Sequence, residues 1–520
     1  MAMAIVIGID VGTSGLKAIA VEAERGAAVA SAHREYPLST PHPGWAEQDP
    51  EDFAAAALSA LGELAHALGP RRGDVKAIGL TGQMHSAVLL DEARAVIRPA
   101  ILWCDTRTTT ECEAIRANAK VGDAGLARLV GNRALEGFTL PKLLWLRAHE
   151  PEAFARVRTV LMPKDFVGMR LTGELGTDDS DASGTLAFSP GDRAFSAELL
   201  DAVGVPRAIF PGSAASNAPL GRLTAEVAAA TGLPEGTLVV RGAADNAAGA
   251  VGLGVVRGGR AMASVGTSGV ILAHTDRWIV EPEMRLHSFC HAVPGRFYLM
   301  GVMLAAGGAL RWYRDVLCDG ERVGAELRKV DPYEIITDTA STAKPGAGGV
   351  VFLPYLMGER TPHNDAAARG AFVGLSARTT KADVSRAVLE GITFGLADSL
   401  SLMRGVGQPN GAAPVVIDEI RLTGGGARSP FWRQLMADVF EAQVAITTST
   451  EGPAYGAALL GAAGAGLFSS VEEAADAFVH VVSRIAPDPA RAARYRDIHA
   501  VYQGLYSDLR ARFRELGKLA

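Results

Sequence analysis

The sequence predicts two related α/β domains that present matching loops to one ligand between them. Its 520 residues are too many for one hydrophobic core, and two domains of about 200–250 residues are expected. The loop Val11-Gly-Thr-Ser-Gly15 recurs letter for letter as Val265-Gly-Thr-Ser-Gly269, an offset of 265 − 11 = 254 residues. In both halves, short β-branched runs that end at glycines alternate with helical patterns, as is typical of α/β folds.

The first half opens with strands on either side of the first loop. Apolar runs over residues 5–9 and 18–21 predict a hairpin. A third strand over 27–36 precedes a proline-rich loop that carries Gly44-Trp-Ala-Glu-Gln48. Asp49 and Pro50 are typical of an N-cap and a first helical position, and that helix should run to about Leu68. Further expected elements are a strand over 75–80, a helix led by 137–147, a helix preceded by Lys164-Asp165 and running through Leu171, a turn-rich segment over 177–184 and a strand over 237–241.

The second half repeats this order. We expect the boundary near 248–258, which gives an N-terminal domain over 1–250, a C-terminal domain over 251–485 and a C-terminal helix over 486–520. Strands are expected near 261–273, 286–302, 350–354, 419–423 and 444–448, with a helix opening at 305–310. The uncharged, Gly/Ala-rich stretch 452–471 predicts a tightly packed helix or loop pair, not a membrane span. Apolar residues in the tail at Tyr495, Ile498, Tyr502, Leu505 and Leu509 follow one helix face and predict a docked helix.

Composition narrows the class of protein. Hydrophobic residues make up 48% and charged residues 21%, which is ordinary for a soluble globular chain. The formal net charge of −6 argues against a nucleic-acid partner or an anionic membrane surface. Four cysteines fit neither a disulfide framework nor a CxxC metal pattern, so a reducing cytoplasm is expected.

The duplicated loop is suited to phosphate. Glycines free its backbone N–H groups and two hydroxyls stand beside them, whereas a Walker loop or a dinucleotide fingerprint would open a helix. Asp10 beside such a loop would repel phosphate unless a cation stands between them, which implies Mg²⁺. The alternative is an ordinary turn that Asp10 stabilises.

Three other groups are candidates with simpler alternatives. Gly424-Gly-Gly-Ala427, after a strand, forms either a flexible connection or, with Ala306-Gly307-Gly308, a nucleotide slot. Asp245 ends a strand and starts a helix whose dipole favours the ionised carboxylate, so it is either an N-cap or a general base. Met84-His85 lines a polyol pocket or is merely structural.

Taken together, these motifs resemble the FGGY carbohydrate kinases, and within that family most of all the xylulokinases. The resemblance runs from about residue 4 to about residue 510 and rests on Asp10-Val-Gly-Thr-Ser-Gly15, Gly82-Gln-Met-His85, residues 137–145, Asp245-Asn246, Gly266-Thr-Ser-Gly269, residues 358–363 and residues 424–426. It departs from the family at Ser86, where glycine is more usual, and at Ala148, which interrupts a signature.

The resemblance implies an actin-like, ribonuclease-H-like fold of two domains with ATP in a deep interdomain cleft. It implies ATP- and Mg²⁺-dependent phosphorylation of D-xylulose to D-xylulose 5-phosphate, with Asp245 as the catalytic base and Asp10 at the metal and phosphate centre. The residues implied to contact the sugar are Met84, His85, Trp103, Asp245 and Asn246. Those implied to hold nucleotide are Thr13, Ser14, Gly266, Thr267, Gly307, Gly425 and Gly426.

Several alternatives stay open at this point. A kinase of this family could instead act on ribulose, gluconate or erythritol. An actin-like chaperone or filament protein would turn over ATP without sugar, and a sugar sensor would not turn it over at all. A monomer and a homodimer are both open.

Overall fold

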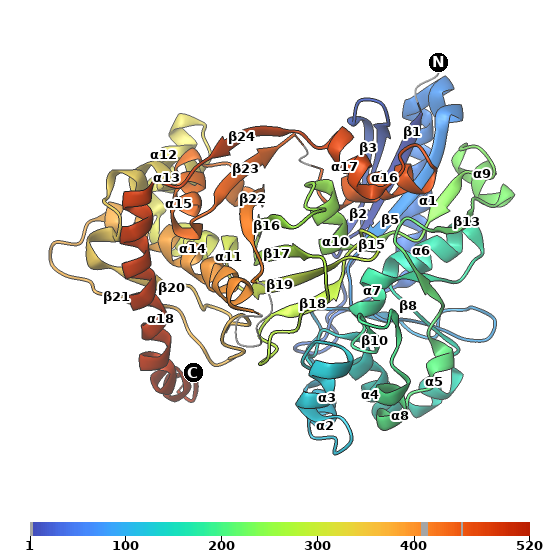
Figure 1. Ribbon diagram of the computed structural model, residues 1–520, viewed down its shortest axis with the longest axis horizontal. Helices are drawn as coiled ribbons and strands as arrows, with labels where there is room; N and C mark the ends of the chain where they lie inside the picture. The colour runs from blue at the N-terminus through green and yellow to red at the C-terminus, as the bar shows by residue number, and fades with distance from the viewer. Residues whose placement is uncertain (1–3, 407–413, 449–450, 520) are drawn as a thin grey trace.

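The computed structural model describes residues 4–406, 414–448 and 451–519. The chain folds into two lobes, each built on a seven-stranded mixed sheet (Figure 1). In the described ranges, no helix combines the length and the apolar character needed to cross a membrane.

The first sheet has the strand order β13-β14-β5-β1-β2-β3. The hairpin β1–β2 and strand β3 are antiparallel neighbours, while β1, β5 and β14 run parallel, and β15 extends the sheet beside the end of β5. The bounds are β1 Ile5–Val11, β2 Gly15–Glu22, β3 Ala27–Glu35, β5 Val75–Gly82, β13 Pro219–Arg222, β14 Leu238–Val240 and β15 Ala243–Ala244.

The second sheet repeats this plan. Its order is β18-β19-β17-β16-β22-β23-β24, with β16, β17 and β19 antiparallel to one another in turn and β16, β22 and β23 parallel. Both copies of the Gly-Thr-Ser-Gly loop join the first two strands of their sheet, which confirms the predicted relation between the halves. The bounds are β16 Gly259–Val265, β17 Gly269–Thr275, β18 His287–Cys290, β19 Phe297–Met303, β22 Ile417–Gly424, β23 Gln443–Thr447 and β24 Val481–Ile485.

Helices cover both sheets. In the first half they are α1 Pro50–Leu68, α2 Thr109–Arg116, α3 Gly122–Leu129, α4 Thr139–His149, α5 Pro151–Arg156, α6 Pro163–Thr172, α7 Asp179–Ser183, α8 Ala197–Val203, α9 Ala225–Thr231 and α10 Asp245–Gly252. In the second half they are α11 Gly307–Leu317, α12 Asp319–Arg328, α13 Pro332–Thr342, α14 Lys381–Gly405, α15 Pro430–Phe440, α16 Pro453–Gly464, α17 Val471–Phe478 and α18 Pro489–Gly517. Asp49 caps α1 as predicted, since its Oδ1 accepts the N–H of Glu51 at 3.0 Å.

Helix α16 belongs to the second half of the chain but packs on the first sheet. It lies beside β1 and β5 in Figure 1 and contacts both strands and α10. The backbones approach so closely that a Cβ at Gly79 would lie 1.8 Å from the carbonyl oxygen of Ala457. A Cβ at Gly456 would lie 1.8 Å from the carbonyl oxygen of Ala248. This close packing explains the Gly/Ala-rich stretch and confirms a tightly packed helix there.

Two local predictions differ from the structure. The segment 177–184, expected to be turns, contains the short helix α7, because the Asp178 carboxylate accepts the N–H groups of Ser180 and Asp181 as an N-cap. Lys164 and Asp165 lie inside the first turn of α6, which begins at Pro163, and do not precede the helix. The predicted tail helix is confirmed as α18, which buries Tyr495 and Tyr502.

Candidate active site

Asp10 and Asp245 lie at the carboxyl ends of neighbouring strands in the first sheet. Asp10 is the last residue but one of β1 and pairs with Thr81 of β5. Ala244 of β15 pairs with Gly82 at the end of the same strand and directly precedes Asp245. Since β1, β5 and β15 are parallel, the two carboxylates share one edge of the sheet, which is where α/β proteins bind ligands.

The electrostatics of Asp10 favour a cation beside it. Its pKa is raised to about 7, first by burial and then by the negative charge of Asp245, while Lys17 opposes the rise. Oxygen Oδ1 of Asp10 is buried without a hydrogen-bond partner. A buried, repelled carboxylate oxygen is costly unless a ligand satisfies it.

This environment fits Mg²⁺ better than a metal held by protein alone. No group of three or more His, Cys, Asp or Glu side chains that could hold a metal occurs in the described part of the chain. Mg²⁺ in phosphoryl-transfer enzymes commonly takes one or two carboxylates and fills its other positions with water and substrate phosphates. Asp10 would therefore supply the protein's contact with the metal, directly or through water.

Asp245 is held in one orientation by the residue that follows it. Its Oδ1 accepts the backbone N–H of Asn246 at 2.7 Å and the side-chain amide of Asn246 at 3.0 Å. Burial raises the pKa of Asp245 to about 6, although both hydrogen bonds lower it. Desolvation is the largest cause of this shift and outweighs the two hydrogen bonds. The carboxylate is still mostly ionised at pH 7.

His85 is fixed as a neutral hydrogen-bond acceptor. Its Nδ1 lies 2.5 Å from the carbonyl oxygen of Gly184, and a carbonyl can only accept, so Nδ1 carries the proton. Burial lowers the pKa of His85 to about 3, the charges of Lys142 and Arg360 lower it further, and the bond to Gly184 opposes them. Atom Nε2 is therefore unprotonated at neutral pH and able to accept a hydrogen bond from a hydroxyl group. The backbone of His85 is left-handed, with φ 70°, and Thr139 and Lys142 both donate to its carbonyl.

The other sugar candidates lie near these two groups. The Asn246 amide reaches the sulfur of buried Met84 at 3.8 Å, which brings Met84 next to Asp245. Trp103, 40% exposed, donates its indole N–H to Oγ1 of Thr13 at 2.9 Å. Trp103 thus touches the first Gly-Thr-Ser-Gly loop, which its place in the sequence did not indicate.

The first loop turns tightly and leaves its tip exposed. The N–H of Gly12 donates to the carbonyl of Gly15 at 3.1 Å, and Ser14 is exposed. Buried Gln48 supports the loop by donating to the carbonyl of Thr13 at 2.8 Å, while it accepts from Gln83 at 3.0 Å.

The nucleotide candidates of the second half gather at one edge of the second sheet. Gly307, at the start of α11, donates its N–H to the carbonyl of Gly266 at 2.8 Å. A Cβ on Gly426 would lie 2.7 Å from Cβ of Val265, next to Gly266. Gly425, Gly266 and Thr267 are exposed. The sequence-predicted slot residues are therefore brought together, with backbone surface available to a ligand.

Comparison with known proteins gives the family. Residues 5–252 match the model of the N-terminal domain of the FGGY family of carbohydrate kinases, and residues 261–465 match its C-terminal domain. The chain belongs to the FGGY family of carbohydrate kinases. It is an enzyme that transfers phosphate to an alcohol group of a sugar, and sugar kinases of this family use ATP as co-substrate.

Its relatives are similar over almost their whole length. A xylulose kinase of Bacillus subtilis is 39% identical over 505 residues, which cover 97% of each chain. The solved xylulose kinase from Rhodospirillum rubrum is 33% identical with a TM-score of 0.89, covering 98% of this chain and 99% of that one. A gluconate kinase from Lactobacillus acidophilus is 28% identical with a TM-score of 0.90 and full coverage of both chains. The predicted two-domain FGGY fold is confirmed.

Three residues of this FGGY kinase site were not assigned from the sequence. Lys17 forms an ion pair with Glu451 at 2.6 Å, and Arg311 donates to Oγ1 of Thr267 at 2.9 Å. Both cations stand beside a Gly-Thr-Ser-Gly loop, and Gln48 supports the first loop from below. Lys17 follows its loop directly and Arg311 lies one helical turn after Gly307, so spacing alone could have indicated both. For Gln48, the sequence shows only that it ends the segment Gly44-Trp-Ala-Glu-Gln48, and nothing in that segment indicates that its side chain contacts the first loop.

The two lobes of the kinase meet at β18. The amide of Asn132 donates to the carbonyl of Ser288 at 2.8 Å and its oxygen accepts the N–H of Ser288 at 3.2 Å. Oγ of Ser183 accepts the N–H of Cys290 at 3.1 Å. Asn132 and Ser183 of the first lobe are therefore bonded directly to β18 of the second lobe.

Proposed function

We propose that this kinase transfers the γ-phosphoryl group of ATP to the terminal hydroxyl of D-xylulose and releases D-xylulose 5-phosphate and ADP. The observation that carries the proposal is the carboxylate of Asp245, with one oxygen held by Asn246 and the other left for a hydroxyl proton beside Met84. The extended similarity to xylulose kinases supports D-xylulose as the acceptor.

In the proposed mechanism, Asp245 accepts the proton of the attacking hydroxyl. A base acts best when its pKa lies near the working pH, and the pKa of Asp245, about 6, meets that condition. His85 accepts a hydrogen bond from another sugar hydroxyl through Nε2, and Trp103 and Asn246 make further contacts with the sugar. Mg²⁺ at Asp10 would neutralise phosphate charge when bound.

The exposed loops hold the nucleotide in this proposal. Thr13, Ser14 and Thr267 present hydroxyls and backbone N–H groups to the phosphates, and Gly266, Gly307, Gly425 and Gly426 let the rest of the nucleotide approach the backbone. Because phosphoryl transfer passes through a loose transition state, positioning and charge neutralisation supply most of the catalysis.

A coupled ADP-release assay across acceptors tests the substrate. D-xylulose should give the highest kcat/KM among D-xylulose, D-ribulose, L-ribulose, xylitol, erythritol and gluconate. Gluconate is the second candidate, because a gluconate kinase shares the fold across the whole chain. A higher kcat/KM for gluconate or a polyol would show that this compound, and not D-xylulose, is the preferred substrate. ADP release at the same rate with and without each sugar would contradict the proposal altogether.

The variant Asp245→Asn tests the base. Asparagine keeps the shape and the acceptor for Asn246 but cannot take a proton, so kcat should fall by about 10²–10⁴ with little change in either KM. A wild-type kcat in a folded Asp245→Asn enzyme would show that Asp245 is not the general base.

A further inference from the structure

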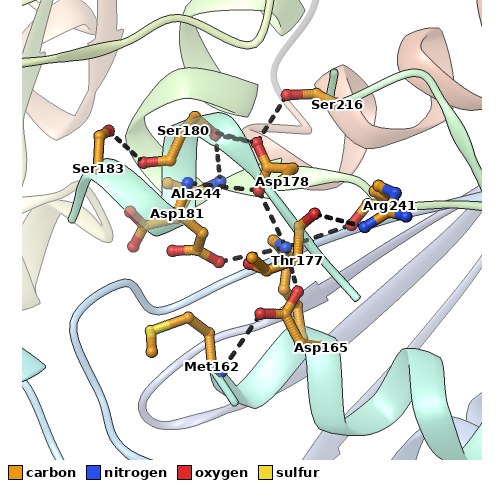
Figure 2. Close-up of polar contacts among 12 residues, drawn as sticks. Met162, Asp165, Thr177, Asp178, Ser180, Asp181, Ser183, Ser216, Arg241 and Ala244 are labelled. Atoms are coloured by element: carbon orange, nitrogen blue, oxygen red, sulfur yellow. Dashed lines mark hydrogen bonds and ion pairs between the residues drawn. The ribbon is translucent and has the colours of Figure 1, made fainter. Parts of the chain in front are cut away.

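The strand segment that leads into Asp245 is held by three buried polar groups from other parts of the first lobe. Nζ of Lys164 donates to the carbonyl of Arg241 at 3.2 Å. The carbonyl of Ser216 accepts the N–H of Gly242 at 2.9 Å. Oγ of Ser180, in α7, accepts the N–H of Ala244 at 3.0 Å. β15 also pairs with the end of β5, but the N–H of Ala244, next to Asp245 in the chain, has the side-chain hydroxyl of Ser180 as its acceptor (Figure 2).

That hydroxyl has no freedom to rotate away. Oγ of Ser180 donates its only proton to Oδ2 of Asp178 at 2.6 Å, so its lone pairs remain for Ala244. Asp178 is fixed in turn by the N–H of Ser180 at 2.8 Å, by Oγ of Ser216 at 2.7 Å and by an ion pair with Lys164 at 3.0 Å. Ser180, Asp178 and Lys164 are each 0% exposed. The Ser180 hydroxyl and both carboxylate oxygens of Asp178 therefore have hydrogen-bond partners, and buried polar groups that are satisfied in this way are held rigidly.

The same short helix also contacts the sugar side and the second lobe. The carbonyl of Gly184, directly after α7, is the acceptor that fixes the His85 ring. Ser183 binds the N–H of Cys290 in β18. Helix α7 and the glycine that follows it thus contact three parts of the protein. These are the segment that carries Asp245, the side chain of His85, which is proposed to bind the sugar, and strand β18 of the second lobe.

We propose that Ser180 is a positioning residue for Asp245: its hydroxyl, oriented by Asp178, sets the place of the Ala244 peptide and through it the carboxylate that faces the substrate hydroxyl. This inference rests on the proposed role of Asp245 as the base. Displacing a reacting group by about 1 Å costs roughly 10²-fold in rate. Removing the hydroxyl leaves the Ala244 N–H buried without an acceptor, and the segment must shift to satisfy it.

A double-mutant cycle with Asp245→Asn separates positioning from general damage. In the wild-type background, Ser180→Ala should lower kcat about 10- to 100-fold, with KM for sugar and ATP changed less than about twofold. In the Asp245→Asn background the same substitution should change kcat less than about twofold, because no carboxylate remains to be positioned. Sugar-independent ATP hydrolysis, which needs no sugar proton acceptor, should fall less than sugar phosphorylation does.

A matched control is Ser385→Ala. Ser385 is 1% exposed and bonded to the hydroxyl of Tyr313 at 2.8 Å, but it lies in α14 of the second lobe. It should lower the melting temperature about as much as Ser180→Ala and leave kcat within about twofold of wild type. If Ser180→Ala does not fold, Ser180→Cys fills the same space with a weak acceptor, and a partial loss of kcat is expected.

The outcomes distinguish the two proposals. A large loss in Asp245→Asn together with wild-type kcat in folded Ser180→Ala or Ser180→Cys would overturn the role of Ser180 alone. Equal loss from Ser180→Ala in both backgrounds would do the same, because the effect would then not pass through Asp245. Wild-type kcat in Asp245→Asn would overturn the base and, with it, this inference.

Discussion

Substituting His85 by alanine should weaken sugar binding and leave nucleotide binding intact. The imidazole has its Nδ1 proton committed to Gly184 and offers Nε2 to the substrate. One neutral hydrogen bond is worth about 0.5–1.5 kcal/mol, so KM for the sugar should rise about 2- to 12-fold. The pKa of His85, about 3, keeps the ring neutral, so this group should make no contribution to the pH dependence of sugar KM between about pH 5 and pH 8.

The assay for His85→Ala is steady-state kinetics with each substrate varied in turn. KM for ATP should change less than about twofold. An interaction that holds the sugar equally well in the ground state and in the transition state affects KM for the sugar when it is lost. His363→Ala is a matched control, because His363 stacks on Tyr506 of the tail helix, with ring centroids 3.5 Å apart, and should leave the sugar KM unchanged. An unaltered sugar KM in His85→Ala, or an equal rise for ATP, would refute the reasoning.

Two further predictions concern the metal and a partly buried histidine, His363. Asp10→Asn should raise the Mg²⁺ concentration needed for half-maximal activity roughly tenfold or more, because it removes the charge beside the phosphate loop; an unchanged Mg²⁺ titration would place the metal elsewhere. Burial lowers the pKa of His363 to about 4 in the folded state, against about 6.5 unfolded. The unfolded chain therefore binds this proton first, and the stabilisation from keeping His363 neutral is complete above about pH 6.5 and is lost as the pH falls towards about 4. Urea unfolding should accordingly show His363→Phe gaining stability relative to wild type over that range, and a difference that does not vary with pH would contradict the assignment.

The strand and loop plan of both lobes could be predicted from the sequence because its signals are local. The apolar run 5–9, the repeated Gly-Thr-Ser-Gly loop and the Asp49-Pro50 helix start each act within a few residues. The roles of single residues remain proposals: Asp10→Asn tests the role of Asp10 at a metal, and the role of Gly425 at nucleotide stays a prediction.

What the sequence did not indicate is the part made by distant segments. Asp10 and Asp245 meet only because β5 pairs with both β1 and β15. The position of α16 on the first sheet cannot be read from its place late in the chain. Residues 177–184 have the polar composition of a surface turn, and only their burial with Lys164 reveals a structural core. The direction of the pKa shift of Asp245 also depends on burial, which composition does not give.

The most direct test of the central claim is to identify the product formed from D-xylulose and ATP. Phosphorus NMR of a complete reaction should show one phosphate ester on the C5 hydroxyl, in equimolar amount with ADP, and none without the sugar. Inorganic phosphate as the main product, or an ester at another carbon, would contradict the account of Asp245 acting on the terminal hydroxyl of D-xylulose.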